Sequence, residues 1–206
     1  MEAAPAGWAA WVIEGTALCR RALADLDGLS LLPDWTRRHV AAHLCLNAEA
    51  LGNLVLWART GREHPMYSSP DQREKDIETG ALHPELRSWF DESAKALSDA
   101  MAELTTAQWQ ARVRTAQGRE ILATEIIWLR SREVLIHAVD LDAGITFADL
   151  PDDFLETLCA EIRAKRGDVP DAHGPLPELA AYLTGRPYSN VLTSEGSPAA
   201  PLPPWL

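Results

Sequence analysis

The sequence predicts a mainly α-helical protein whose N-terminal two thirds form a four-helix bundle. Four segments of about twenty residues carry apolar side chains at spacings of three and four, the period of a helix with one buried face. One short, one long and one medium connection join them, as in a bundle of neighbouring helices. With 47% hydrophobic and 24% charged residues, the 206-residue chain has the composition of a soluble globular protein with one substantial core.

The four expected helices have recognisable ends. They cover residues 6–26, 36–58, 84–104 and 122–142. Thr36 or Asp34 offers a capping side chain for the second helix, and Pro84 suits the first turn of the third. Residues 61–80 are rich in proline and serine and are expected to form a long loop, in which residues 70–78 suit a short polar helix. Loops of this length inside compact domains often cover a functional site.

Two parts of the chain depart from this pattern. Residues 113–119 have the character of an extended connector that leads into the fourth helix. Near the C-terminus we expect a helix, a turn-rich stretch, a short helix and a proline-rich tail, at residues 150–166, 167–175, 176–184 and beyond. The expected domains are therefore a bundle, residues 1–146, and a short C-terminal helical segment with its tail, residues 147–206.

Charge and cysteine content limit the partners and the cellular compartment that the protein is expected to have. The net charge of −11 argues against nucleic acid or an anionic membrane as the main partner, although a local basic pocket for a small anion is compatible with it. Cys19, Cys45 and Cys159 are odd in number and widely spaced, which fits buried free thiols in a reducing compartment better than disulfides. No basic segment precedes an apolar run at the N-terminus, so a cytoplasmic location is expected.

Two of the expected helices carry residues that suit a metal site. Glu133 and His137 stand four apart and leave the fourth helix on one face. Such a pair is usually an ordinary surface pair, but His39, His43 and Asn47 form a similar stripe on the second helix. For His39, in the first turn, a solvated position is favoured. His43 lies among apolar residues, and its spacing leaves two roles open, a metal ligand or a hydrogen-bonded core histidine. Together His43, Glu133 and His137 offer three N/O ligands and leave one zinc position open.

Several motifs together resemble the mycothiol-dependent maleylpyruvate isomerases, members of the DinB-like superfamily of metal-binding four-helix bundles. They are the segments around His43, in the long loop, in the connector, around Glu133 and His137, and at the C-terminus, at residues 35–44, 65–70, 115–119, 130–141 and 202–206. The resemblance implies a DinB-like bundle with bound zinc and with mycothiol as cofactor. Residues 167–175 form only a short bridge where the family has further strands, which predicts a small, shortened C-terminal segment.

The resemblance also assigns roles to individual residues. It places the zinc ligands at His43, Glu133 and His137, and an arginine needed for activity at Arg186 in a Gly-Arg pair. A guanidinium is a planar fork that suits a substrate carboxylate. Asn47 and Arg130 lie close to the expected ligands along their helices, and we name them as weaker candidates for substrate or thiol binding. For Arg130 a structural ion pair is an equal alternative.

Three functions are compatible with these residues. A zinc-activated thiolate can add to the double bond of a cis-enoate diacid such as maleylpyruvate, allow rotation and leave again, which makes the protein a cis–trans isomerase. The same thiolate could be transferred to an electrophile, which makes it a mycothiol S-transferase. The third function is a non-catalytic metal-stabilised binding module. A structural zinc normally has four protein ligands, so three ligands favour an enzyme that acts on a small anionic substrate.

Overall fold

A computed structural model of the chain describes residues 6–167 and 171–205. Contacts along the chain divide it into two units, Met1–Ala143 and Gly144–Leu206. The sequence places the domain boundary at nearly the same point, between residues 146 and 147.

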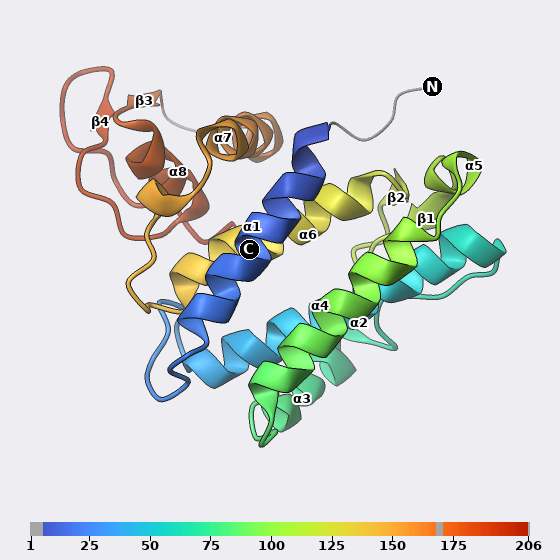
Figure 1. Cartoon of the computed structure of the whole chain (residues 1–206). Coiled ribbons are helices and arrows are strands. Elements are labelled where there is room, and N and C mark those ends of the chain that lie inside the picture. Colours follow the sequence, from blue (N-terminus) through green and yellow to red (C-terminus); the bar gives the residue numbers. More distant parts are fainter. Residues whose placement is uncertain (1–5, 168–170, 206) are drawn as a thin grey trace. The chain divides into compact units, whose positions relative to one another are not determined.

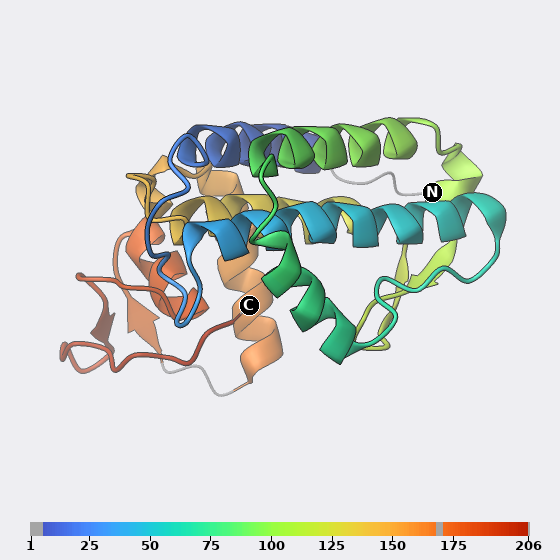
Figure 2. The same ribbon diagram turned by 90° about the horizontal axis from the view of Figure 1, so that it is seen from below.

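Four long helices form a bundle in the first unit. They are α1 (Ala6–Ala22), α2 (Arg37–Thr60), α4 (Leu86–Ala102) and α6 (Glu125–Asp140). Helix α1 packs mainly against α6, and α2 packs mainly against α4 and also against α6. The bundle is visible in Figure 1 and, seen from below, in Figure 2, where α2 runs along the length of α4. The predicted mainly α fold with a four-helix bundle is confirmed.

Helix α2 supplies much of the core of this unit. Thr36 caps its N-terminus in an extended conformation, and Gly61 ends it in a left-handed conformation. Leu44, Leu51 and Leu54 on α2 are completely buried, and each such side chain contributes about 1.5 to 3 kcal/mol relative to an exposed one. Among the described residues, α2 is also the one helix long and apolar enough to cross a membrane, but 67% of its apolar window is buried inside the protein. A core helix has the same composition, so this is weak evidence for a membrane span.

A glycine lets α1 approach α6 closely. A Cβ atom on Gly15 would lie 2.5 Å from Val134 Cγ2 and 2.9 Å from Leu135 Cγ. Because real Cβ atoms do not come this close to other heavy atoms, any side chain at position 15 would push the two helices apart. The contact falls on the turn of α6 that directly follows Glu133, so it fixes the part of α6 that carries the candidate ligands.

The connections contain more regular structure than the sequence pattern predicts. The expected connector is half of a hairpin, in which β1 (Arg112–Arg114) pairs antiparallel with β2 (Glu120–Leu122). The alternation of the strands buries Val113 and Ile121 in the core beside α2. Their neighbours Arg112, Arg114 and Glu120 are exposed, and Leu122 is half-buried. The prediction that the fourth helix begins at residue 122 is wrong for this reason. The hairpin takes residues 120–122, and α6 begins at Glu125.

The long loop after α2 contains the short polar helix that the sequence predicts. This helix, α3 (Pro70–Gly80), begins with proline in its first turn, and the Ser69 side chain accepts a hydrogen bond from Gln72 N. A further short helix, α5 (Thr106–Trp109), precedes the hairpin.

In its described residues, 144–167 and 171–205, the second unit contains two helices, a 3-10 turn and a pair of two-residue strands. Its elements are η1 (Phe147–Asp149), α7 (Asp152–Arg166), β3 (Ala172–His173), α8 (Leu176–Thr184) and β4 (Leu192–Thr193). Strand β3 pairs antiparallel with β4, and α7 packs against α8. Helix α8 ends at Gly185 with φ 72°, where a Cβ would lie 2.6 Å from Pro203 O, so only glycine allows the C-terminal tail to pass here.

Candidate metal and active site

Three side chains from α2 and α6 converge inside the first unit. The ligand atoms of His43, Glu133 and His137 all lie within 4.8 Å of one another. His43 Nε2 is 2.9 Å from Glu133 Oε2, and His137 Nε2 is 3.4 Å from the same oxygen. Two ligand atoms that are each about 2.1 Å from a tetrahedral zinc ion are about 3.4 Å apart. The spacing and the two-nitrogen, one-oxygen donor set therefore fit a single zinc ion.

Helix geometry explains how these residues meet. Glu133 and His137 are one turn apart on α6, so both project from the same face, and His43 projects from α2, which packs against α6. The two imidazole rings meet edge to face with centroids 4.9 Å apart. Both histidines are buried, with 5% and 4% of their surface exposed, while the Glu133 side chain is 16% exposed.

A carboxylate behind His137 completes this side of the site. Asp140, one turn further along α6 and completely buried, accepts a hydrogen bond of 2.8 Å from His137 Nδ1. Burial opposes a charge on His137, but the hydrogen bonds to Asp140 and Glu133 prevail and raise its pKa to about 9. A carboxylate at Nδ1 fixes the ring orientation that leaves Nε2 free for a metal, as in many zinc sites. Asp140 was not predicted, although its position three residues after His137 is the available signal.

The pKa values of the other two candidate ligands, His43 and Glu133, are both lowered, but for different reasons. Burial lowers the pKa of His43, so this ring is neutral near pH 7. Burial alone would raise the pKa of Glu133, but hydrogen bonds from His137 and His43 hold it well below its usual value. Glu133 is therefore ionised, which is the form in which a carboxyl group binds zinc.

An arginine that the sequence analysis did not single out reaches His43 from α3. Arg73 Nη2 lies 3.2 Å from His43 Nδ1, and the guanidinium lies 5.7 Å from the centroid of the Tyr67 ring. Burial, followed by the charge of Glu133, raises the pKa of Tyr67, so its hydroxyl stays protonated. The expected loop at residues 61–80 thus supplies two side chains beside the candidate ligands. No sequence motif pointed to Arg73, because this contact joins residues thirty positions apart.

Asn47 and Arg130 are brought together next to this cluster. Arg130 Nη1 donates hydrogen bonds to Leu44 O at 2.9 Å and to Asn47 Oδ1 at 2.8 Å. Arg130 is only 1% exposed, and burial lowers its pKa. Its Nη2 has no hydrogen-bond partner among the described residues. Among the described residues Arg130 forms no ion pair with a carboxylate, and Leu44 and Asn47 hold its side chain in place.

Arg186 lies in the second unit, directly after α8. Its backbone N–H donates to Ala181 O at 2.9 Å and its Nη1 donates to Thr184 O at 2.7 Å, and the residue is 5% exposed. The catalytic role that the resemblance implies for Arg186 stays a prediction.

The sequence matches a protein-family model, and its structure matches two solved structures. Residues 4–142 match the family described as "Mycothiol maleylpyruvate isomerase N-terminal domain". The chain belongs to this family. The two solved structures are of a mycothiol-dependent maleylpyruvate isomerase and of a histidine-to-alanine mutant of it. Each is 36% identical, has a TM-score of 0.89, and is matched over 96% of this chain and 95% of its own. A search of curated proteins gives no match.

As a member of this family, the chain is a thiol-dependent isomerase enzyme. The structural match also corrects one expectation about the C-terminal segment. Because the match covers 95% of the solved isomerase, the C-terminal segment is not markedly shortened relative to that relative. The stretch that was expected to be only a bridge, residues 167–175, contains strand β3, whose partner β4 lies twenty residues later. Strands of two residues have no recognisable alternation, and so the sequence pattern did not predict them.

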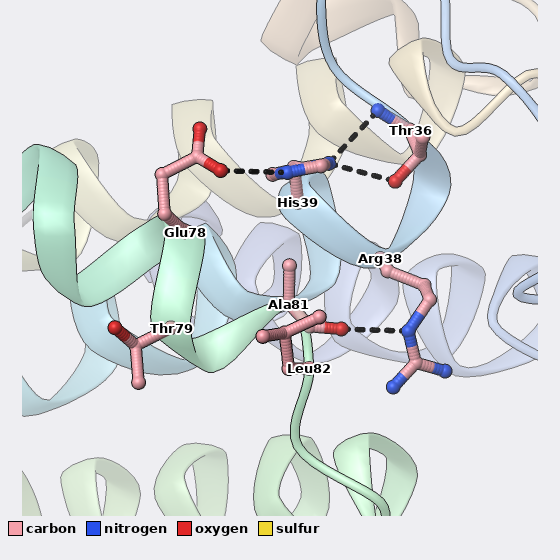
Figure 3. A pocket seen from close by; sticks show the side chains of 7 residues that line it. All are labelled: Thr36, Arg38, His39, Glu78, Thr79, Ala81 and Leu82. Carbon is pink, nitrogen blue, oxygen red and sulfur yellow. Dashed lines mark hydrogen bonds and ion pairs between the residues drawn. The ribbon is translucent and has the colours of Figure 1, made fainter.

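His39 lies outside the ligand cluster, beside a surface hollow. Its Nδ1 interacts with Thr36 Oγ1 at 2.7 Å, and its Nε2 lies 3.3 Å from Glu78 Oε2. Figure 3 shows these contacts at the edge of a hollow of about 340 Å³ that is lined by Thr36, Arg38, His39, Glu78, Thr79, Ala81 and Leu82. His39 does not join the cluster of candidate ligands. Its side chain is only 20% exposed, less than the solvated position that the sequence favours, because it completes the helix cap with Thr36.

The three cysteines are buried free thiols, as the sequence predicts. Burial raises the pKa of Cys19 and of Cys45 to about 12 and that of Cys159 to about 11. A thiol with so high a pKa is a poor nucleophile at neutral pH. None of the three cysteines is therefore suited to supply a reactive thiolate near pH 7.

Proposed function

We propose that this chain is a zinc- and mycothiol-dependent cis–trans isomerase that acts on maleylpyruvate or a similar cis-enoate diacid. The observation that carries the proposal is the convergence of His43, Glu133 and His137 on the fold of the isomerase family. Three protein ligands leave a position open for a thiol, which is the arrangement of catalytic rather than structural zinc sites.

Side chains of the protein itself would have separate roles around this open position. Bound zinc and mycothiol together would supply a thiolate at neutral pH, the nucleophile that reversible addition to an enoate requires. Glu133 and the neutral His43 provide ligand atoms without first losing a proton, and Asp140 keeps His137 oriented. Enclosure by α2 and α6 keeps water away from these groups and strengthens their interactions.

Positive side chains would bind the anionic substrate. We assign one substrate carboxylate to Arg186, whose fork of N–H groups suits a carboxylate. Asn47 and Arg130 are weaker candidates for contact with substrate or thiol. Arg130 is buried, and its Nη2 has no hydrogen-bond partner within residues 6–167 and 171–205. Both observations support this role, because a bound anion would pair with the charge and with Nη2.

The main alternative is a mycothiol S-transferase built on the same ligand set. The two functions differ in the fate of the sulfur, since an isomerase returns the thiol and a transferase consumes it. The test supplies the zinc-loaded protein with maleylpyruvate and one-tenth as much mycothiol, and follows product by mass spectrometry. Many turnovers per thiol, with product and substrate of equal mass, support the isomerase. A stable thioether formed one for one with the thiol excludes it. Metal analysis of the same sample tests whether the ion is zinc.

A further inference from the structure

The two helices that carry the candidate ligands belong to different helix pairs of the bundle. Helix α6, with Glu133 and His137, packs mainly against α1, whereas α2, with His43, packs mainly against α4 (Figure 1). The ligand cluster therefore lies where the two pairs meet. Because the distances from zinc to its ligands vary by only about 0.2 Å between sites, a shift of one pair against the other would pull the ligands apart. The site thus needs a contact that fixes α2 relative to α6.

Arg130 makes such a contact. It lies three residues before Glu133, on the same face of α6, and its Nη1 donates hydrogen bonds to Leu44 O at 2.9 Å and to Asn47 Oδ1 at 2.8 Å. Leu44 directly follows His43 on α2, and Asn47 lies one turn after it. The guanidinium therefore joins the turn of α6 that precedes one candidate ligand to the turn of α2 that follows another.

Burial makes this contact firm. Arg130 is 1% exposed and Asn47 is 4% exposed, so water does not compete for the two hydrogen bonds. Hydrogen bonds from a charged donor are also stronger than those between neutral groups. The ion pair of Arg59 with Glu103 is a contrast, because its side chains are 44% and 64% exposed, and exposed pairs contribute little.

Helix α1 fixes α6 on the other side of Glu133. Cys19 Sγ donates a hydrogen bond of 2.9 Å to Val134 O, and Gly15 allows α1 to approach the same residue closely. Glu133 thus has a tethered neighbour on each side along α6, Val134 towards α1 and Arg130 towards α2. The tether to α2 is the one that spans the two helix pairs.

We infer that Arg130 is a positioning residue of the metal site, and that its Nη1 sets the separation of His43 from Glu133 and His137. This inference rests on the proposed zinc ligands. It is independent of the substrate contact that Arg130 Nη2 would make, because that contact uses the other terminal nitrogen of the guanidinium.

The test compares metal binding by the wild type with that of Arg130→Met, Arg130→Lys, Asn47→Ala and the double variant Arg130→Met/Asn47→Ala. Zinc affinity is measured by competition with a chromophoric chelator, at a temperature at which circular dichroism shows each protein to be folded. Cobalt(II) replaces zinc in a second set of samples, because its absorption spectrum reports the coordination geometry.

Arg38→Met is the matched control. Arg38 also lies on α2, and its guanidinium donates hydrogen bonds of 2.6 Å each to Ala81 O and His83 O. The same substitution there removes two hydrogen bonds to α2 that do not involve α6. The melting temperature of each metal-free variant shows how much general stability is lost.

We expect Arg130→Met to weaken zinc binding about tenfold to hundredfold, the usual effect of losing a residue behind a metal ligand, and to change the cobalt spectrum. Arg130→Lys should lose less, because an ammonium still donates. Asn47→Ala removes one of the two acceptors and should lose about threefold to tenfold. The double variant should lose no more than Arg130→Met, because both residues act through one contact. Arg38→Met should stay within about threefold of wild type, even where its melting temperature falls as far.

Three results would overturn the inference. The first is wild-type zinc affinity and cobalt spectrum in Arg130→Met with a lowered melting temperature, which indicates a role in folding alone. The second is tighter zinc binding in Arg130→Met, which indicates that Arg130 acts on the metal by charge repulsion. The third is additive losses in the double variant. If Arg130→Met does not fold, unchanged zinc binding in Asn47→Ala has the same force.

A failure of the ligand assignment itself would be visible separately, because the wild type would then bind no zinc. That result would remove the basis of the inference as well. None of these measurements involves turnover, so the maleylpyruvate assay tests the isomerase assignment on its own.

Discussion

Replacing His43 with alanine gives the sharpest test of the metal site. The substitution removes one of three protein ligands. It also leaves Glu133 with His137, 3.4 Å away, as its remaining partner in the cluster. Because the ligands come from two separate helices, α6 alone would then offer only two ligand atoms to a metal. We expect His43→Ala to lose zinc while the bundle stays folded.

The expected losses of zinc affinity and of folding stability can both be estimated. Zinc sites with four protein ligands bind with about 10 to 16 kcal/mol, or about 3 kcal/mol for each ligand, so losing one ligand weakens binding more than one-hundredfold. The fold loses one buried hydrogen bond, which costs about 1 to 3 kcal/mol. For a chain of this length that lowers the melting temperature of the metal-free protein by roughly 2 to 12 °C.

The assay combines chelator competition for zinc affinity with circular dichroism for helical content and melting temperature. His39→Ala is the matched control, because it changes the same residue type one turn earlier on α2. It removes the contacts to Thr36 and Glu78, which should cost about 0.5 to 2 kcal/mol, the usual cost of a lost helix cap, and leave zinc affinity intact. Stoichiometric zinc in His43→Ala would refute the ligand assignment, and so would equal zinc loss in the two variants.

Three further predictions test other parts of the site. Asp140→Asn should weaken zinc binding about tenfold to hundredfold in the same competition assay, because His137 loses its charged partner. Arg186→Lys keeps the charge but not the fork, so turnover should fall clearly with a melting temperature within about 2 °C of wild type; parallel losses of both would indicate a structural role. The pKa values of Cys19 and Cys159 are raised to about 12 and about 11, so iodoacetamide at pH 8 should leave both thiols unmodified in the native protein and alkylate them in urea. Rapid labelling of the native protein would contradict the burial of these side chains.

The same raised pKa values give stability a defined pH dependence. The folded protein keeps the Cys19 and Cys159 thiols protonated at pH values where the unfolded chain, with a pKa near 9.0, has lost those protons. Stability from this source is therefore complete below pH 9 and falls as the pH rises from 9 towards 12.

Much of the bundle could be predicted because each helix is recognisable from the residues of its own segment. Apolar residues at spacings of three and four define α2, α4 and α6 without knowledge of what they pack against. The same periodicity placed Glu133 and His137 on one face. It could not show the hairpin, because Val113 and Ile121 are single buried residues in three-residue strands, and a period of two needs more residues to be recognised.

The choice between His39 and His43 shows where local information ends. Both lie on one stripe of α2, and spacing alone treats them alike. The packing of α2 against α6 decides between them, because it buries His43 beside Glu133, whereas His39 lies at the helix N-terminus and is used by the cap. The resemblance to the isomerase family had selected His43, and the geometry now gives the physical reason.

The contacts behind the two histidines explain why the long loop belongs to the site. His137 is oriented from within its own helix, since Asp140 lies one turn away and a helix fixes that distance. His43 has no such carboxylate at Nδ1, where the loop helix α3 supplies Arg73 instead. One histidine is thus oriented from within its own helix, and the other is contacted by a helix of the long loop. The loop therefore forms part of the wall around the candidate ligands, as loops of this length in compact domains often do.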